Sequence, residues 1–360
     1  MSISVLLIAP SMNIVGGQSI QADRLLKAFA SDAEVRLRLW SIDTRLPSVI
    51  RRIPYVRTFV NAPVYYSGLL KGIREADVVH AFTSSFWGYT LWVIPAIWLS
   101  RVFGRKMIVN YRDGRAESHL AGWRSAVATL KRVDAIVVPS RYLVEVFGRF
   151  GLQAEVVPNV IDLRSFRYRE RRVLRPEFLT NRGLEPLYNV DCVLRAFQII
   201  QGRYPEARLV VGNDGPLRSE LEQLASELGL RSVTFTGAVS QGRMAEMYDA
   251  ADIYVMSPVI DNMPGTVLEC FASGLPIVST AAGGVPHVAE NGRNALLTPL
   301  GSPEALAGAC FRLLEEPSLA FRLAEQGYRD CVERYSVDSV RQQWHAVYGR
   351  NLNSWPPNSD

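Results

Sequence analysis

Short apolar stretches alternate with helical stretches along most of this chain, and the alternation limits the folds open to it. β-Branched and other apolar residues fill each short stretch, which is typical of strands buried on both faces of a parallel sheet. The pattern runs through both halves of the sequence, so we expect an α/β protein with two doubly wound domains. The predicted strands are 5–9, 35–40, 77–81, 107–110 and 135–139 in the first half, and 178–181, 208–211, 232–235, 253–256 and 277–279 in the second.

The length of 360 residues also fits two ordinary domains better than one. The segment VVPNVID at 156–162 closes the first half, and the chain is expected to be helical after residue 301. Apolar residues recur at helical spacing on one face of the last helix, at Val340, Trp344, Val347 and Tyr348. The predicted parts are a first domain at 1–160, a second at 161–336, a last helix at 337–352 and a frayed polar tail at 353–360.

Composition argues against several classes of protein. An apolar fraction of 48% and a charged fraction of 21% describe a packed globular protein. The cysteines form no C-x-x-C pair and the histidines are far apart, so neither a metal nor another cofactor is expected. The apolar amino terminus is too short for a signal sequence, which indicates a cytoplasmic protein. The four cysteines, expected to be reduced and mostly buried, are Cys192, Cys270, Cys310 and Cys331.

A long uncharged run at 78–100 has the length of a bilayer span. Polar residues from Thr83 to Ser85 interrupt it, and Pro95 lies within it. A buried strand followed by a core helix therefore explains this run better than a membrane span.

The segment DNMPGTVLE, from Asp261 to Glu269, carries the strongest indication of chemistry. An apolar strand precedes it, and Pro264 and Gly265 lead into a short apolar helix, where proline is favourable at the first turn. The start of such a helix presents free N–H groups and the positive end of a dipole, which suits a phosphate. Asp261 and Glu269 flank this start, and carboxylates accept hydrogen bonds from paired sugar hydroxyls. The segment therefore indicates a nucleotide-sugar site.

This segment resembles the E-x7-E element of glycosyltransferase family 4, a family of retaining nucleotide-sugar glycosyltransferases with the GT-B fold. The family form is Glu, seven residues, Glu and then Ala-x-Ala-x-Gly-x-Pro-Val. This chain has Asp261 for the first Glu and keeps Glu269, Ala272, Gly274 and Pro276. The resemblance implies two Rossmann-like domains facing across a cleft, with a C-terminal helix that crosses back to the first domain. The first domain would serve the acceptor and the second the donor.

The resemblance also implies roles for individual residues. Glu269 would bind the ribose hydroxyls, and Asp261 would lie against the transferred sugar. Backbone groups of Asn262, Met263, Gly265 and Thr266 would hold sugar and phosphate, because Pro264 has no N–H. An ordinary strand–loop–helix unit with incidental acidic residues is the alternative.

Three other segments resemble donor-binding parts of the family. Gly16, Gly17 and Gln18 correspond to a loop that closes over the diphosphate. Backbone groups at Ala238 and Val239 would meet the base. The sequence GGVP at 283–286 matches a family loop in which His287 replaces an acidic residue. Ordinary glycine turns remain the alternative for each segment.

The departures from the family pattern concern charge. Arg182 matches an arginine that binds the donor phosphates, but the family's Lys-Gly pair aligns with Tyr188 and Asn189. The family's His-Asp-Gly is Arg112-Asp113-Gly114 here. Our hypothesis is that Arg112 restores the missing cationic character, and the alternative is a surface ion pair between Arg112 and Asp113 or Glu117. His80 lies at the end of a predicted strand, where family members often carry a polar residue on the acceptor side, and it is either catalytic or structural.

Basic residues suggest a location for the protein. The segment 44–74 has no acidic residue, and a second segment at 164–175 holds six arginines. Such segments suit an anionic membrane surface or a lipid diphosphate, although solvated basic faces are the alternative. Nucleic acid is not expected as a partner, because no binding module accompanies the charge. The aromatic residues interleaved in the first segment are Tyr55, Phe59, Tyr65 and Tyr66.

The sequence therefore predicts a retaining glycosyltransferase of the hexosyltransferase type, cytoplasmic and peripheral at the inner face of the cell membrane. It would move a sugar from a nucleotide-diphosphate sugar to a glycan or lipid-linked acceptor, in polysaccharide or glycolipid synthesis. The sequence has no Asp-x-Asp motif, so protein groups are expected to meet the charge of the leaving diphosphate. A nucleotide-sugar epimerase with the same fold and a nucleotide-sugar-binding pseudoenzyme are the alternatives.

Overall fold

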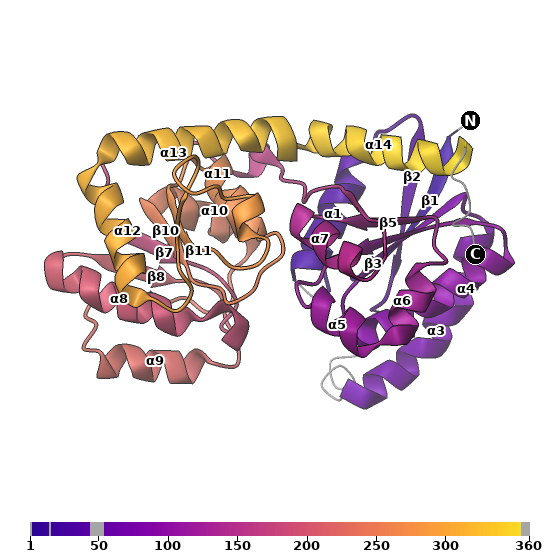
Figure 1. Ribbon diagram of the computed structural model, residues 1–360, viewed down its shortest axis with the longest axis horizontal. Coiled ribbons are helices and arrows are strands. Elements are labelled where there is room, and N and C mark those ends of the chain that lie inside the picture. The colour runs from indigo at the N-terminus through magenta and orange to yellow at the C-terminus, as the bar shows by residue number, and fades with distance from the viewer. Residues whose placement is uncertain (1, 14–15, 44–53, 354–360) are drawn as a thin grey trace. The chain divides into compact units, whose positions relative to one another are not determined.

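Two compact units make up the chain. The computed structural model describes residues 2–13, 16–43 and 54–353 (Figure 1). Unit 1 comprises residues 1–160 together with 337–360, and unit 2 comprises 161–336. Each unit is built around one parallel sheet of six strands.

The sheet of unit 1 has the order β2-β1-β3-β4-β5-β6. From β1 the chain passes to β2 at one edge and then returns to β3 on the other side of β1, from where it continues to β6. This reversal makes the sheet doubly wound, as the alternating pattern predicts. The strands are β1 (Ile3–Ala9), β2 (Val35–Ser41), β3 (Val78–Thr83), β4 (Lys106–Tyr111), β5 (Ala135–Val138) and β6 (Glu155–Val156).

Side chains that alternate along these strands enter two different cores. Leu6 and Ile8 of β1 pack in one apolar cluster with helices α3, α4, α5, α6 and α7, whereas Val5 and Leu7 pack in another with α1 and α14. Both faces of the sheet are therefore covered, which is why its central strands are mostly apolar, whereas the edge strand β2 carries Arg36 and Arg38. The helices are α1 (Gly17–Ala28), α3 (Pro54–Arg74), α4 (Ile94–Val102), α5 (Ala116–Gly122), α6 (Arg124–Leu130), α7 (Arg141–Arg149) and α14 (Val337–Asn353).

The last helix, α14, returns to unit 1, where it contacts α1. Its predicted apolar face is confirmed, because Val340, Trp344, Val347 and Tyr348 are all buried there. The Nε2 atom of His345 lies 2.7 Å from an oxygen of Asp32, which adds a polar contact to this packing.

The sheet of unit 2 repeats the design with the order β12-β11-β10-β7-β8-β9. Phe178 and Leu209 pack on one face with helices α8, α9 and α12, and Leu179 and Tyr254 pack on the other with α11. The strands are β7 (Glu177–Thr180), β8 (Arg208–Val211), β9 (Val233–Phe235), β10 (Ile253–Met256), β11 (Ile277–Thr280) and β12 (Leu296–Thr298). The helices are α8 (Val190–Arg203), α9 (Arg218–Glu227), α10 (Gln241–Ala250), α11 (Gly265–Ala272), α12 (Pro303–Glu315) and α13 (Pro317–Asp330).

The uncharged run at 78–100 forms a strand and a helix inside unit 1. It contains β3, a π-helical turn at Tyr89–Val93 and most of α4. This confirms the buried strand followed by a core helix. In the described part of the chain, no helix combines the length and the apolar character that a bilayer crossing requires. All four cysteines are buried and free, as predicted.

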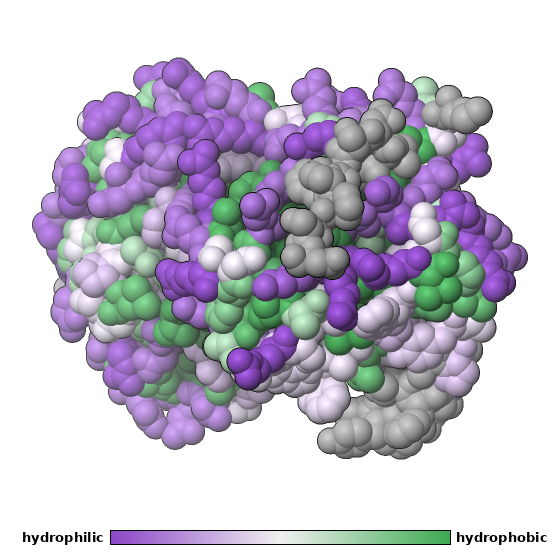
Figure 2. All heavy atoms as spheres, turned by 45° about the vertical axis from the view of Figure 1, so that its right-hand side comes forward, coloured by the Kyte–Doolittle hydropathy of each residue, from purple (hydrophilic) through white to green (hydrophobic). Residues whose placement is uncertain are grey.

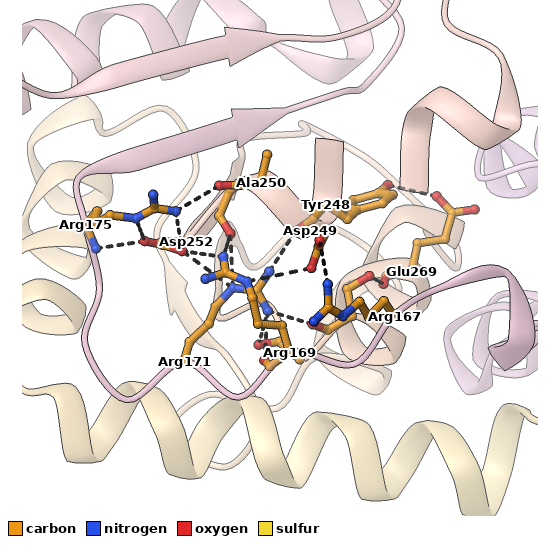
Figure 3. A network of polar contacts seen from close by, with 12 residues as sticks. Arg167, Arg169, Arg171, Arg175, Tyr248, Asp249, Ala250, Asp252 and Glu269 are labelled. Atoms are coloured by element: carbon orange, nitrogen blue, oxygen red, sulfur yellow. Dashed lines mark hydrogen bonds and ion pairs between the residues drawn. The ribbon is translucent and has the colours of Figure 1, made fainter. Parts of the chain in front are cut away.

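The arginine-rich segment at 164–175 is partly an internal network rather than a binding surface (Figure 3). Arg169 and Arg175 form ion pairs with the buried carboxylate of Asp252, and the Arg175 Nε lies 2.8 Å from Oδ2. Arg171 is buried, and its guanidinium donates to the carbonyl oxygens of Ala251, Ser273, Gly274 and Tyr248 at 2.6–3.0 Å. The hypothesis of a partner surface is therefore wrong for Arg171, which is fully buried, whereas the side chains of Arg169 and Arg175 stay 28% and 60% exposed.

Candidate active site

The loop between β10 and α11 is fixed against the glycine pair at 283–284. The N–H of Gly284 donates to the Asp261 carbonyl at 2.7 Å. A Cβ atom on Gly283 would lie 2.4 Å from that same oxygen, and one on Gly284 would lie 1.8 Å from the Asn262 carbonyl. Only glycine permits this contact of two backbones, and Gly283 also has a φ of +52°. The glycine pair thus sets the position of Asp261 and Asn262.

Helix α11 begins where the sequence predicts. Pro264 is its N-cap residue and Gly265 its first helical residue, so Thr266 lies in the first turn. The Asn262 N–H donates to Oδ1 of Asp261 at 2.7 Å, which turns this carboxylate toward its own loop. The side chain of Met263 is buried in the core, so only its backbone is available to a ligand.

Arg182 and Asp261 form an ion pair at the start of α11. Nη2 of Arg182 lies 2.5 Å from Oδ2 of Asp261, and Nη1 donates to Thr266 Oγ1 at 3.2 Å. Burial alone would lower the pKa of Arg182, but the Asp261 carboxylate outweighs it and the pKa is raised. Arg182 therefore stays charged. Three residues that the sequence analysis proposed for the donor lie together here.

Tyr188, which replaces the family lysine, packs on this arginine. The guanidinium carbon of Arg182 lies 4.2 Å from the centre of the Tyr188 ring, within cation–π distance. Burial raises the pKa of Tyr188, although Arg182 opposes the shift, so the ring is neutral at physiological pH. Tyr188 therefore positions the cation of the site without adding a second one.

A chain of hydrogen bonds holds Glu269, which lies in the second turn of α11. The Tyr254 hydroxyl donates to Asn181 Oδ1 at 2.9 Å, and Asn181 Nδ2 donates to the Tyr248 hydroxyl at 2.7 Å. The Tyr248 hydroxyl donates to Glu269 Oε2 at 2.8 Å (Figure 3). Burial raises the pKa of both tyrosines, and the Glu269 carboxylate raises that of Tyr248 further, so both hydroxyls remain protonated donors. Sequence analysis missed all three residues, because Tyr248 on α10, Tyr254 on β10 and Asn181 just after β7 occupy positions that indicate only core packing.

The predicted base-binding residue Val239 is half-buried between β9 and α10. It belongs to unit 2, like Arg182, Asp261 and Glu269. The role of Val239 in binding the base stays a prediction.

Gly16, Gly17 and Gln18 form the start of α1 in unit 1. Gly16 is the N-cap, and its N–H donates to Ser19 Oγ at 2.9 Å. Gln18 Nε2 donates to the Thr83 carbonyl at 3.3 Å. Both glycines are exposed, and a Cβ atom on either would meet no described atom within 4 Å. The packing of unit 1 does not require glycine at these positions, which leaves room for close approach by a ligand.

Arg112 follows β4 in unit 1 and makes no ion pair among the described residues. It donates to Asn159 Oδ1 and lies 4.6 Å from the centre of the Phe82 ring. Burial lowers its pKa to about 9. Asp113 pairs with Arg115 and Glu117 with Arg149, so the alternative of a surface ion pair is wrong.

His80 is fully buried in unit 1 and both of its ring nitrogens have partners. Nδ1 lies 2.8 Å from the Tyr348 hydroxyl and Nε2 lies 3.2 Å from Asn110 Nδ2. Burial lowers its pKa well below the usual value, so the ring is neutral. This arrangement favours the structural role over the catalytic one, because a substrate would have to displace α14 to reach the ring.

Acidic, histidine and cysteine side chains do not gather into a metal-binding group. Within the described residues, no three of them lie together in a way that could hold an ion. The polar groups of the candidate site are instead the Arg182–Asp261 pair, Thr266 and Glu269, all in unit 2.

Comparison with known proteins places both units in one class. Residues 15–165 match the family described as Glycosyltransferase Family 4, and residues 170–330 match Glycosyl transferases group 1. Among related proteins, the lipopolysaccharide core biosynthesis glycosyltransferase LpsE of Rhizobium meliloti is 32% identical over 241 residues, which cover 65% of this chain and 70% of that protein. The alpha-D-kanosaminyltransferase of Streptomyces kanamyceticus is 25% identical over 277 residues, which cover 69% and 72%.

Solved structures agree on the fold. The crystal structure of HepE from Anabaena in complex with UDP has a TM-score of 0.77 to this chain, covers 97% of it and 100% of its own chain, and is 16% identical. At this identity the likeness shows the GT-B fold. The protein is a glycosyltransferase of the GT-B class, and the chain belongs to glycosyltransferase family 4, which includes the group 1 glycosyltransferases.

Proposed function

We propose that this enzyme transfers a hexose, with retention of configuration, from a nucleoside diphosphate sugar bound to unit 2. The observation that carries the proposal is the charged group at the start of α11, where Arg182, Asp261 and Thr266 lie together. Glu269, eight residues after Asp261, is held by the buried Tyr248 hydroxyl. These groups match the chemical demands of a diphosphate and a ribose.

The proposed roles follow from charge and hydrogen bonding. Arg182 and the N–H groups at the start of α11 meet the charge that develops on the leaving diphosphate. Glu269 accepts from the ribose hydroxyls, and Asp261 accepts from the transferred sugar. In a front-face reaction, the departing phosphate oxygen takes the proton of the attacking acceptor hydroxyl. Gly16 and Gly17 of unit 1 are proposed to approach the same diphosphate.

Donor binding tests the proposal directly. UDP, GDP and ADP, each with and without an attached hexose, are to be screened by thermal shift, followed by transfer assays with labelled donors. We expect one nucleoside diphosphate to raise the melting temperature, because a ligand that binds only the folded state stabilises it. If no nucleotide stabilises the protein, the proposal fails.

A nucleotide-sugar-binding pseudoenzyme is the second candidate. It is favoured by Tyr188, which replaces a cation, and by the ion pair that already occupies Arg182. Labelled donor separates the two candidates, because a pseudoenzyme would bind it and release neither transferred sugar nor nucleoside diphosphate.

The acceptor is proposed to be a glycan or a lipid-linked glycan, at an anionic membrane surface. The name of the relative LpsE, which refers to lipopolysaccharide core biosynthesis, supports a cell-surface product. Two aromatic residues of the segment 44–74 are engaged within unit 1 and do not support the proposed membrane contact. The hydroxyls of Tyr65 and Tyr66 donate to buried backbone carbonyls of Trp92 and Leu91. Tyr55 and Phe59 lie outside the described side chains.

Replacing Tyr248 with phenylalanine is expected to weaken donor binding about tenfold. The substitution removes the hydrogen bond to Glu269, and a bond to a charged group contributes roughly 1.5 kcal/mol or more. The loss should fall on the ribose, so the enzyme should discriminate less between a ribose and a 2′-deoxyribose donor. KM values for both donors check this, and an unchanged ratio would contradict it.

Replacing Arg112 with alanine is expected to cut turnover at least tenfold while the protein stays folded, if its unpaired cation serves the reaction. Replacement with lysine should restore part of the rate, since the charge remains. Initial rates and melting temperatures of both variants provide the measurement. Unchanged turnover in the alanine variant would refute the hypothesis.

A further inference from the structure

Two tryptophans lie at the surface of unit 1, beyond the carboxyl ends of β3 and β4. Trp87, in the loop after β3, is 67% exposed, and Trp123, between α5 and α6, is half-buried. Their ring centres are 5.4 Å apart with an interplanar angle of 86°. An indole ring carries one of the largest apolar areas of any side chain, so a paired and exposed one marks a binding surface.

The backbone around Trp87 is irregular on both sides. Phe86 has a φ of +59°, a value that a bulky side chain rarely adopts, and a π-helical turn follows at Tyr89–Val93. The turn is also tight, because a Cβ atom on Gly88 would lie 2.4 Å from Ser84 Oγ. Strain of this kind costs about 1–3 kcal/mol and persists where the surrounding structure imposes it, which is common at binding sites.

Buried polar contacts impose this geometry. The Ser85 N–H donates to Asp113 Oδ2 at 3.1 Å, and its hydroxyl lies 2.8 Å from that of Tyr111. The Tyr111 hydroxyl lies 2.7 Å from Nδ1 of His119.

His119 joins the two tryptophan-bearing segments. It is buried, and its ring centre lies 5.1 Å from that of Phe86 and 5.5 Å from that of Trp123. Burial lowers the pKa of His119 to about 4, so the ring is neutral at pH 7. The two tryptophans are therefore held in place rather than left as mobile surface groups.

We propose that Trp87, packed edge to face against Trp123, is the platform on which a pyranose ring of the acceptor stacks. The inference rests on the proposed function, because transfer requires a second substrate while the candidate nucleotide-binding side chains gather in unit 2. Ligands of open parallel sheets bind outside the carboxyl ends of the strands, where this platform lies. A pyranose offers a face of C–H groups to an indole ring, and its hydroxyls find polar partners at the rim.

The surroundings of the platform favour a sugar over a lipid surface. Arg115 and Asp113 form a bidentate ion pair beside Phe86. They supply hydrogen-bond donors and acceptors for the hydroxyls of a sugar. The face drawn in Figure 2 mixes purple, white and green side chains, and no single green area extends across it. A pyranose needs only a platform the size of one or two rings.

Saturation-transfer NMR tests the platform without a donor. The probes are methyl α-glycosides of glucose, mannose and galactose, added to the full chain. We expect ring protons of at least one probe to receive saturation, and Trp87→Ala to weaken that binding roughly fivefold, the loss of about 1 kcal/mol of stacking. Trp123→Ala should act in the same way, and Trp87→Phe should retain part of the signal.

Trp98→Ala is the matched control, because Trp98 is 45% exposed on α4 and lies under the guanidinium of Arg132. It should leave the signal unchanged. Melting temperatures show whether each variant is folded. If Trp123→Ala is unfolded, Trp87→Ala alone decides the test.

Three results would overturn the proposal. The first is that no probe receives saturation from the unaltered chain. The second is that Trp87→Ala transfers as much saturation as the unaltered chain. The third is that Trp87→Ala loses sedimentation with phosphatidylglycerol vesicles but keeps its binding of the probes. Nucleotide thermal shifts are measured in parallel. If they fail while the probes still bind through Trp87, the proposed function falls and the sugar platform stands. If they persist while no probe binds, only the platform falls.

Discussion

Replacing Arg182 with alanine should reduce kcat/KM for the donor by about tenfold to a hundredfold. A charge-assisted hydrogen bond contributes roughly 1.5–3 kcal/mol, and we propose that Arg182 is the unit 2 side chain that carries positive charge to the diphosphate. The variant also leaves the Asp261 carboxylate without its partner at 2.5 Å, which adds repulsion toward the phosphates. Steady-state kinetics with varied donor give the measurement.

Two further variants distinguish the loss of the Arg182 charge from a general loss of stability. Arg243→Ala removes an arginine whose ion pair with Glu246 is exposed on α10, and it should change neither activity nor stability measurably. Arg182→Ala combined with Asp261→Asn should regain stability relative to the single variant but not activity. If Arg182→Ala retained full donor affinity, the diphosphate would have to bind elsewhere.

The fold could be predicted largely because most central strands are apolar on both faces. Continuous apolar runs such as Ile253–Met256 are visible in the sequence without knowledge of neighbours. The two strands that the analysis missed, Glu155–Val156 and Leu296–Thr298, are too short to show a period. Each forms the outer edge of its sheet, where pairing with the neighbouring strand defines it.

The candidate site was predictable in part. The spacing of Asp261 and Glu269 and the arginine at 182 are local or family features, so the sequence indicates them. The hydrogen bonds from Asn181 through Tyr248 to Glu269 depend on contacts between segments 67 and 21 residues apart. No pattern within one segment records such contacts.

The arginine-rich segment at 164–175 shows that charge pairs between distant segments are equally hard to predict from the sequence. Its charges suggested a surface for an anionic partner, because an excess of cations has no local partner in the sequence. The partner of Arg169 and Arg175 is Asp252, which lies 83 and 77 residues away along the chain. The charges within one segment therefore could not identify a buried counter-ion that lies far away in the sequence.

Replacing Asp252 with alanine should destabilise unit 2 by about 3–5 kcal/mol, because it leaves the buried Arg171 and the partly buried Arg169 without their carboxylate. The Asp252 side chain is fully buried (Figure 3). Burial would raise its pKa, but hydrogen bonds from Arg175 and Arg169 outweigh this and lower the pKa below the usual 3.8. Since the folded-state pKa is the lower one, the stabilisation is complete above about pH 4 and is lost as the pH falls through the folded-state value.

The difference in unfolding free energy between Asp252→Ala and the unaltered protein should therefore be large at pH 7 and shrink as the pH falls below 3.8. Urea titrations at several pH values measure it. Asp191→Ala is the control, since its pair with Arg195 is exposed on α8 and should contribute less than about 1 kcal/mol. A loss of unfolding free energy that stayed constant with pH would mean that Asp252 acts through packing alone. A loss no larger than that of the control would mean that the arginines find other partners. The network would then not fix the end of α10, which carries Tyr248, or the end of α11.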